Sequence, residues 1–177
     1  MEKELIIRLY LMLLNPGITP EIYSSLSEQE KSMLSHSLSG YSLKKEFRSK
    51  IKVVLTGGVF DIIHMGHIYT LTQAKKLGDI LIVAIAKDSH ISKKGRKPIH
   101  SQEYRANMVE MLKPVDLTIL GMEKPEDLVS KVHPNIIVYG YDQPDFIKPE
   151  GVEIIKLTES VDKDNLKTQK IIDKFGL

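Results

Sequence analysis

The stretch that decides the fold of this chain is KVVLTGGVFDIIHMGH, residues 52–67. It begins with a short apolar, β-branched run that predicts a buried strand over 51–56. Two glycines end this run and allow close approach of the backbone. Beyond them, apolar residues at helical spacing predict a helix over 66–77, namely Ile68, Leu71, Ala74 and Leu77. The order is therefore a strand, a glycine-rich turn with a His-x-Gly-His motif, and a helix.

The His-x-Gly-His motif lies at the predicted start of that helix. A helix N-terminus presents unpaired N–H groups and the positive end of a dipole, so it attracts phosphate. His64 and His67 are three residues apart and face the same side, and Gly66 leaves room for a phosphate chain against the backbone. The motif predicts a site that stabilises negative charge on a polyphosphate.

From residue 51 onward, predicted strands and helices alternate, which is typical of a parallel sheet covered on both faces. We expect an α/β, Rossmann-like, doubly wound domain over 51–177. Such a sheet binds its ligand where the strand order reverses, here between the turns after the first and fourth strands. The expected strands are 51–56, 80–86, 115–120, 136–139 and 152–157; the expected helices are 66–77, 102–112, 125–132 and 166–175, and 87–101 is expected to be a basic loop.

Residues 1–50 predict a helical appendage and linker without any catalytic pattern. Helices are expected over 2–15, from Pro20, and over 28–38, where Ser27-Glu28-Gln29-Glu30 has the form of a capping box. Residues 41–50 are expected to be a linker or a short helix. The appendage fits a packing or dimerisation element, or a lid over the acceptor site. A DNA-binding unit is disfavoured because Ser27–Gly40 contains few basic residues.

Composition excludes several classes of site and partner. The chain has 177 residues, a net charge of +2 and no cysteine, so disulfides, thiolate zinc sites and a cysteine nucleophile are excluded and no nucleic-acid partner is implied. The apolar run Leu5–Leu14 contains Arg8 and is shorter than the roughly 20 residues that span a bilayer. Glu2 and Glu4 disfavour a signal peptide. We expect a cytoplasmic protein with no membrane span.

The whole string Gly-x-Phe-Asp-x-x-His-x-Gly-His resembles the HxGH nucleotidyltransferase superfamily of cytidylyltransferases and adenylyltransferases. The matching residues are Gly58, Phe60, Asp61, His64, Gly66 and His67. The resemblance implies that an acceptor phosphate attacks the α-phosphorus of ATP or CTP and that pyrophosphate leaves. His64 and His67 would stabilise charge in the transition state. Mg²⁺ would bridge phosphate oxygens, with few direct protein ligands. Asp61, the nearest carboxylate, would either contact the metal or cap its own turn.

The same resemblance implies a set of nucleotide contacts around the two turns. Asp142 would accept from a ribose hydroxyl or a base amine, or bond its own turn, and Gln143 would read a base edge. The expected nucleotide-binding residues are Gly58, Val59, Phe60, His64, Met65, Gly66, His67, Asp142, Gln143 and Thr168.

Cations are expected to meet the acceptor phosphate or the leaving pyrophosphate. Lys97 is the expected catalytic lysine, and Lys93 is either a phosphate contact or a surface charge. Arg105 matches an arginine of the relatives, or forms a surface ion pair on its helix. Many cytidylyltransferases carry Arg-x-x-Gly-Ile-Ser-Thr-Thr before the last helix, but residues 162–172 lack its arginine and glycine. Lys167 is expected to replace that cation.

Further details resemble the archaeal-type FAD synthetases more than the glycerol-3-phosphate cytidylyltransferases. These are KGRKPI (94–99), MLKPVD (111–116), ILG (119–121) and PNIIV (134–138). They imply an FMN adenylyltransferase. The alternatives are a CTP-dependent cytidylyltransferase acting on glycerol phosphate or another polyol or amino-alcohol phosphate, and a non-catalytic nucleotide-binding sensor.

The resemblance leaves the acceptor pocket and the assembly as expectations. An isoalloxazine ring requires an apolar or aromatic slot, for which Tyr139, Tyr141 and Phe146 are the candidates. Members of the superfamily are often dimers, so a homodimer is expected. Three further histidines lack metal-ligand grouping and are expected at the surface: His90, His100 and His133.

Overall fold

The computed structural model describes residues 2–92, 97–141, 143–144 and 147–159. Contacts within the chain divide it into two compact units, residues 1–52 and residues 53–177. Buried apolar residues occur in both units, among them Ile6 and Leu9 in the first and Leu71 and Leu81 in the second. Each unit therefore has a core of its own.

The first unit begins with three helices, α1 (Glu2–Leu14), α2 (Pro20–Ser25) and α3 (Glu28–Met33). The Thr19 side chain accepts a hydrogen bond from the N–H of Ile22, and Pro20 occupies the first helical turn. At α3 the Ser27 side chain caps the backbone while the Glu30 side chain returns to the Ser27 N–H. The predicted capping box is confirmed.

The prediction of a helix over 28–38 is wrong in its second half. The expected helix over 28–38 ends at Met33, and residues 34–43 form an antiparallel hairpin of β1 (Leu34–Ser37) and β2 (Gly40–Leu43), followed by the short α4 (Lys45–Arg48). Serine side chains compete with helical backbone bonds, and here the hydroxyls of Ser35 and Ser42 meet across the strands at 2.9 Å. Gly40 takes φ +107° in the turn, a conformation that glycine permits.

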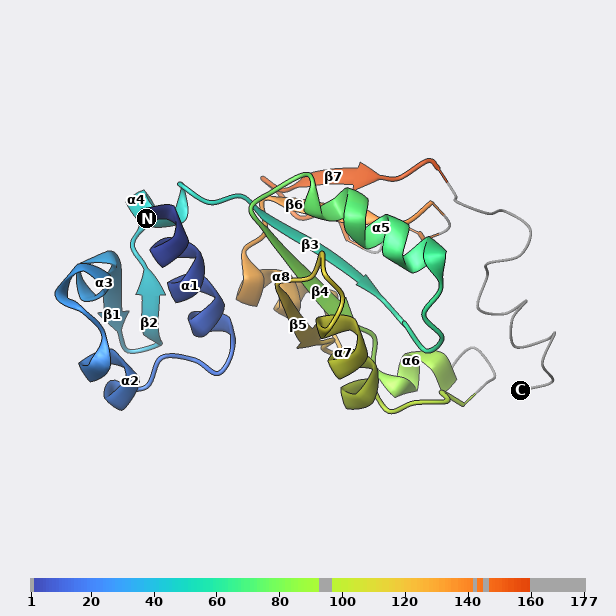
Figure 1. The fold of residues 1–177 in the computed structure, drawn as a ribbon, viewed down its shortest axis with the longest axis horizontal. Helices are drawn as coiled ribbons and strands as arrows, with labels where there is room; N and C mark the ends of the chain where they lie inside the picture. Colours follow the sequence, from blue (N-terminus) through green and yellow to red (C-terminus); the bar gives the residue numbers. More distant parts are fainter. Residues whose placement is uncertain (1, 93–96, 142, 145–146, 160–177) are drawn as a thin grey trace. The chain divides into compact units, whose positions relative to one another are not determined.

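The second unit is built on a five-stranded parallel sheet with strand order β5-β4-β3-β6-β7 (Figure 1). This confirms the predicted α/β, doubly wound fold. Its elements are β3 (Val53–Gly58), α5 (Met65–Lys75), β4 (Ile80–Ile85), α6 (Asp88–Ser92), α7 (Gln102–Glu110), β5 (Leu117–Leu120), α8 (Pro125–Val132), β6 (Ile136–Tyr139) and β7 (Glu153–Lys156).

Helices α5 and α7 cover the same face of the sheet. Leu71 and Ala74 of α5 share one core cluster with Ala106 and Val109 of α7 and with alternate residues of β4. The chain then crosses through α8 from β5 to β6, in the opposite direction along the sheet. Because such crossovers are right-handed, α8 lies on the other face. The strand order thus reverses between β3 and β6, the pair that the sequence predicted to flank the ligand.

Most element boundaries agree closely with the predictions. α8 and β6 occupy the predicted ranges 125–132 and 136–139, and Ser101 caps α7 through the N–H of Tyr104 as expected. The loop expected over 87–101 contains the five-residue α6, so that part of the prediction is wrong; α6 is too short to show an apolar periodicity. The helix expected over 166–175 lies outside the described residues.

Candidate active site

The turn between β3 and α5 has a backbone conformation that its sequence explains. Phe60 takes φ +53° and is buried, so its ring packs beneath the turn. A Cβ on Gly58 would lie 2.8 Å from this ring, and a Cβ on Gly66 would lie 3.1 Å from the His64 ring. Both glycines therefore leave space for side chains that the turn needs.

The two histidines of the motif form a stacked pair at the start of α5. His64 occupies the N-cap position, and its carbonyl accepts from the N–H of His67 at 2.9 Å. The ring centroids lie 3.9 Å apart with an interplanar angle of 26°, and the Phe60 ring lies 5.0 Å from that of His67. The sequence prediction that both side chains face one side is confirmed.

The environment of His67 keeps its imidazole neutral. Burial, together with the neighbouring His64, lowers the pKa of His67 to about 3. Its Nδ1 atom is buried and has no hydrogen-bond partner among the residues that the structure describes. A neutral ring next to a helix N-terminus can donate a hydrogen bond to a phosphate oxygen.

Asp61 connects this turn to the segment that carries Lys97. Its buried carboxylate accepts the backbone N–H of Ile99 at 3.0 and 3.1 Å and that of His100 at 3.1 Å. These bonds join Asp61 to a segment 38 and 39 positions further along the chain. Lys97 lies two residues before Ile99 and is exposed. The carboxylate thus fixes the base of a lysine-bearing loop beside the histidine motif.

Arg105 is placed differently from either sequence interpretation. Its side chain is 0% exposed. The guanidinium donates to the carbonyls of Val59, of His100 at 3.1 Å and of Ala86 at 2.7 Å, and to the carboxylate of Asp88 at 2.6 Å. It is therefore neither a surface ion pair nor an exposed phosphate contact, but a buried clamp on three loops.

A helical pattern in the sequence could have revealed the burial of Arg105. The residues of α7 that face inward recur at helical spacing, namely Gln102, Arg105, Ala106 and Val109. An arginine on the inward face of a helix requires several acceptors, and the carbonyls at the ends of parallel strands provide them. Apart from His100, the partners lie 17 to 46 positions away in the sequence and could not be predicted.

The turn after β6 contains Gln143, which lies where the sequence placed it, opposite the glycine-rich turn. Its side-chain amide donates to the carbonyl of Gly57 and accepts from the N–H of Gly140, both at 2.9 Å. Tyr139, a candidate for the ring slot, is instead a core residue whose hydroxyl bonds to the backbone of Ile147 at 3.1 Å. Tyr141 is half-buried in the turn.

Several predicted site residues lie outside the described residues, namely Lys93, Asp142, Phe146, Lys167 and Thr168. Of the three histidines expected at the surface, His133 is exposed and His90 lies 4.0 Å from a Glu123 carboxylate oxygen. His100 is half-buried, and its ring stacks on that of Tyr104 at 4.7 Å. In residues 2–92, 97–141, 143–144 and 147–159, no group of three or more His, Asp or Glu could hold a metal ion.

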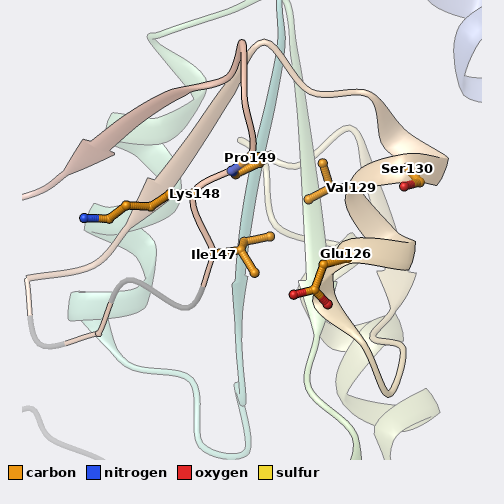
Figure 2. Close-up of a pocket in the computed structure, with 6 residues that line it drawn as sticks. All are labelled: Glu126, Val129, Ser130, Ile147, Lys148 and Pro149. Carbon is orange, nitrogen blue, oxygen red and sulfur yellow. The ribbon is translucent and has the colours of Figure 1, made fainter.

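A surface pocket of about 320 Å³ lies beside α8 (Figure 2). Its lining residues come from α8 and from residues 147–149 of the connection between β6 and β7, and none of them belongs to the turn between β3 and α5 that carries the histidine motif. It is lined by Glu126, Val129, Ser130, Ile147, Lys148 and Pro149. Among the described helices, none is both long and apolar enough to cross a membrane.

Comparison with known proteins agrees with this geometry. The family model described as cytidylyltransferase-like matches residues 55–172. An FAD synthase from Thermococcus sibiricus is 40% identical over 142 residues, which are 72% of this chain and 94% of that protein. An FAD synthase from Pyrococcus horikoshii is 44% identical over 139 residues, 71% and 93% of the two chains.

A solved structure is also similar to this chain. It is described as the lipopolysaccharide core biosynthesis protein from Thermoplasma volcanium GSS1. It is 37% identical, with a TM-score of 0.58, over 63% of this chain and 99% of that one.

Proposed function

The chain belongs to the cytidylyltransferase-like family, and we propose that it is an FMN adenylyltransferase, which makes FAD from ATP and FMN. The observation that carries this proposal is the similarity to FAD synthases at 40% and 44% identity over almost the whole length of those proteins. The stacked histidines at the N-terminus of α5 support it, since they suit charge on a triphosphate.

In the proposed reaction a phosphate oxygen of FMN attacks the α-phosphorus of MgATP. An oxygen–phosphorus bond forms, the bond from the α-phosphorus to the bridging oxygen breaks, and pyrophosphate leaves with that electron pair. Mg²⁺ enters as part of the nucleotide substrate. Such a transfer depends on positioning and on charge stabilisation, without a covalent nucleophile on the protein.

The residues of the β3–α5 turn have defined tasks in this proposal. Backbone groups of Gly58, Val59 and Phe60 hold the triphosphate, with Met65 and Gly66 at the helix N-terminus. His64 and His67 donate hydrogen bonds to oxygens that gain charge in the transition state. The neutral imidazole of His67 fits such a role, because it can donate a hydrogen bond.

The proposed binding site for FMN combines a lysine side chain with an aromatic side chain. Lys97 neutralises the phosphate of FMN or the leaving pyrophosphate, and Lys93 and Lys167 are proposed to assist it. Asp142 and Thr168 are proposed to contact the nucleotide. Tyr141, half-buried in the turn after β6, is the described candidate for contact with the isoalloxazine ring. Arg105 holds the loops around these groups and has no direct phosphate contact in this proposal.

The experiment that tests this function measures pyrophosphate release with Mg²⁺ for each pairing of nucleotide and acceptor. The nucleotides are ATP and CTP, and the acceptors are FMN, glycerol phosphate and inositol phosphate. Release with ATP plus FMN alone is the expected result. Release only with CTP and a polyol phosphate contradicts the proposal, and silence with bound nucleotide indicates a sensor without catalysis.

We also propose a homodimer, in which residues 1–52 contribute to the assembly. The described part of this unit carries no catalytic pattern, and both FAD synthases match little more than 70% of the chain. Sedimentation of the full chain should give about twice the 20.1 kDa mass of one chain. A species of one chain mass at micromolar concentration contradicts the proposal.

A further inference from the structure

The ladder between β3 and β6 ends just before the two turns of the site. The paired residues run from Val54 opposite Ile136 to Thr56 opposite Val138. The last pair is reinforced because the Thr56 hydroxyl donates to the carbonyl of Val138 at 2.9 Å. Beyond this point the strands connect to opposite sides of the sheet, which opens a crevice at such a switch point.

The side-chain amide of Gln143 continues the connection past the end of this ladder. Its Nε2 donates to the carbonyl of Gly57, and its Oε1 accepts from the N–H of Gly140, each at 2.9 Å. The backbone N–H of Gln143 also donates to the carbonyl of Gly140 at 3.1 Å. One primary amide thus occupies the position that a peptide group has in a ladder.

The opposite side of the same turn is held by β4. Pairing between β3 and β4 continues to Gly58 opposite Ile85, and the N–H of Ala86 donates to the carbonyl of Gly58 at 2.8 Å. The carbonyls of Gly57 and Gly58 are therefore fixed from the two sides. The chain leaves this point directly into Val59 and Phe60, towards the histidines.

We infer that Gln143 is a positioning residue that sets the spacing between the two turns that hold the nucleotide. This inference rests on the proposed function, since it assigns the nucleotide to that crevice. It replaces the expectation that Gln143 reads a base edge, because both ends of its amide are bonded to backbone groups. Gln143 should therefore affect the binding of the triphosphate as much as the binding of the base.

A second glutamine provides a matched control. The Nε2 of Gln102 donates to the carbonyl of Ile85 at 2.7 Å and to that of Gly121 at 3.3 Å. It joins the ends of β4 and β5 by donating to one carbonyl at each, away from the point where the strand order reverses. Methionine has nearly the length of glutamine and removes the amide without adding charge.

The test compares full-length Gln143→Met and Gln102→Met. Calorimetry gives the Kd for MgATP and for inorganic tripolyphosphate, steady-state kinetics gives the KM for FMN, and thermal unfolding gives Tm. We expect a fall in Tm for both variants, because each removes two hydrogen bonds between a side-chain amide and the backbone. Gln143→Met should weaken the binding of ATP and of tripolyphosphate at least tenfold, with the KM for FMN unchanged within twofold. Gln102→Met should change neither Kd nor the KM for FMN by more than twofold.

Three results would overturn the inference. Unchanged ATP affinity in Gln143→Met removes the positioning role, and equal losses in Gln102→Met reduce it to a general effect of stability. Weaker binding of ATP with unchanged binding of tripolyphosphate would indicate that Gln143 contacts a base edge instead. Binding is measured separately from turnover. A wild-type protein that binds ATP without forming FAD would therefore contradict the proposed function, while the Kd values of the two variants would still test the role of Gln143.

Discussion

The rings of His64 and His67 stack with centroids 3.9 Å apart at the N-terminus of α5. This contact places two hydrogen-bond donors on one side of a helix end that already favours phosphate. Because His67 is neutral, the pair can form without repulsion between two imidazolium ions. The glycine between them keeps the backbone accessible.

Replacement of His67 by alanine should remove one donor to the transition state. We expect kcat/KM to fall by about 10²–10³, the effect of removing one such donor. Tm should fall only modestly, because the ring contacts with His64 and Phe60 are lost while the buried Nδ1 that has no described partner is removed with them. The matched control is His90→Ala, a partly exposed histidine outside the motif, which should retain full activity. Equal activity of the two variants contradicts the role of His67.

The lowered pKa of His67 has a defined consequence for stability at low pH. The unfolded chain protonates this histidine below about pH 6.5, its ordinary value, while the folded chain keeps it neutral down to about pH 3. Between these values the unfolded state binds more protons, so stability falls as the pH decreases from 6.5 towards 3.

The measurement is Tm against pH for the wild type and for His67→Gln. Between pH 7 and pH 4 the Tm of the wild type should fall more than that of His67→Gln. Above pH 7 the difference in Tm between the two proteins should stay constant. A constant difference throughout this range is incompatible with a depressed pKa at this position.

Arg105 should be one of the residues on which stability depends most. Arg105→Leu leaves three loop carbonyls and the Asp88 carboxylate without their donor. Breaking a buried charged network of this kind costs about 3–5 kcal/mol in the free energy of unfolding. Asp88→Asn, which keeps an acceptor on a side chain that is 43% exposed, should cost less than about 1 kcal/mol.

Denaturant unfolding of the full chain measures both variants of this pair. Similar small decreases in the free energy of unfolding of the two variants would show that the carbonyl contacts of Arg105 contribute little to stability. A loss confined to Arg105→Leu supports the buried clamp on the loops after β3 and β4.

Asp61→Asn should loosen the segment that carries Lys97. An amide in place of the carboxylate retains one oxygen for the N–H groups of Ile99 and His100. Losing such charge-assisted bonds costs about 1–3 kcal/mol. We expect faster hydrogen exchange at these two amides and a several-fold higher KM for the acceptor.

Asp116→Asn is the matched control for this prediction. Its carboxylate accepts the N–H of Leu81 at 2.6 Å, at the start of β4, whereas the segment that Asp61 binds follows the end of β4. It should lower stability without selectively accelerating exchange at Ile99 and His100. Unaltered exchange at both amides in Asp61→Asn would remove Asp61 from the support of the Lys97 segment.

Local sequence patterns predicted the elements whose signals are local. Pro125 at the start of α8 and the apolar run Ile136–Tyr139 gave bounds that the structure reproduces. The hairpin over 34–43 was missed because its serines pair across strands, and a pattern along one strand does not reveal its partner.

Part of the candidate site could also be predicted, but the supporting contacts could not. The motif places His64 and His67 on one helix turn, so their proximity follows from the sequence. The bonds of Asp61 to Ile99 and of Gln143 to Gly57 join residues 38 and 86 positions apart. Their side chains respond to backbone groups that only the folded sheet brings within reach.

The most direct test of the central claim follows the α-phosphate of ATP. The full-length protein is incubated with Mg²⁺, FMN and ATP labelled with ³²P at the α-position, and the products are separated by chromatography. An FMN adenylyltransferase transfers the label into FAD with one pyrophosphate released for each FAD formed. If the label stays in ATP while labelled CTP reacts with a polyol phosphate, the assignment to FAD synthesis is wrong.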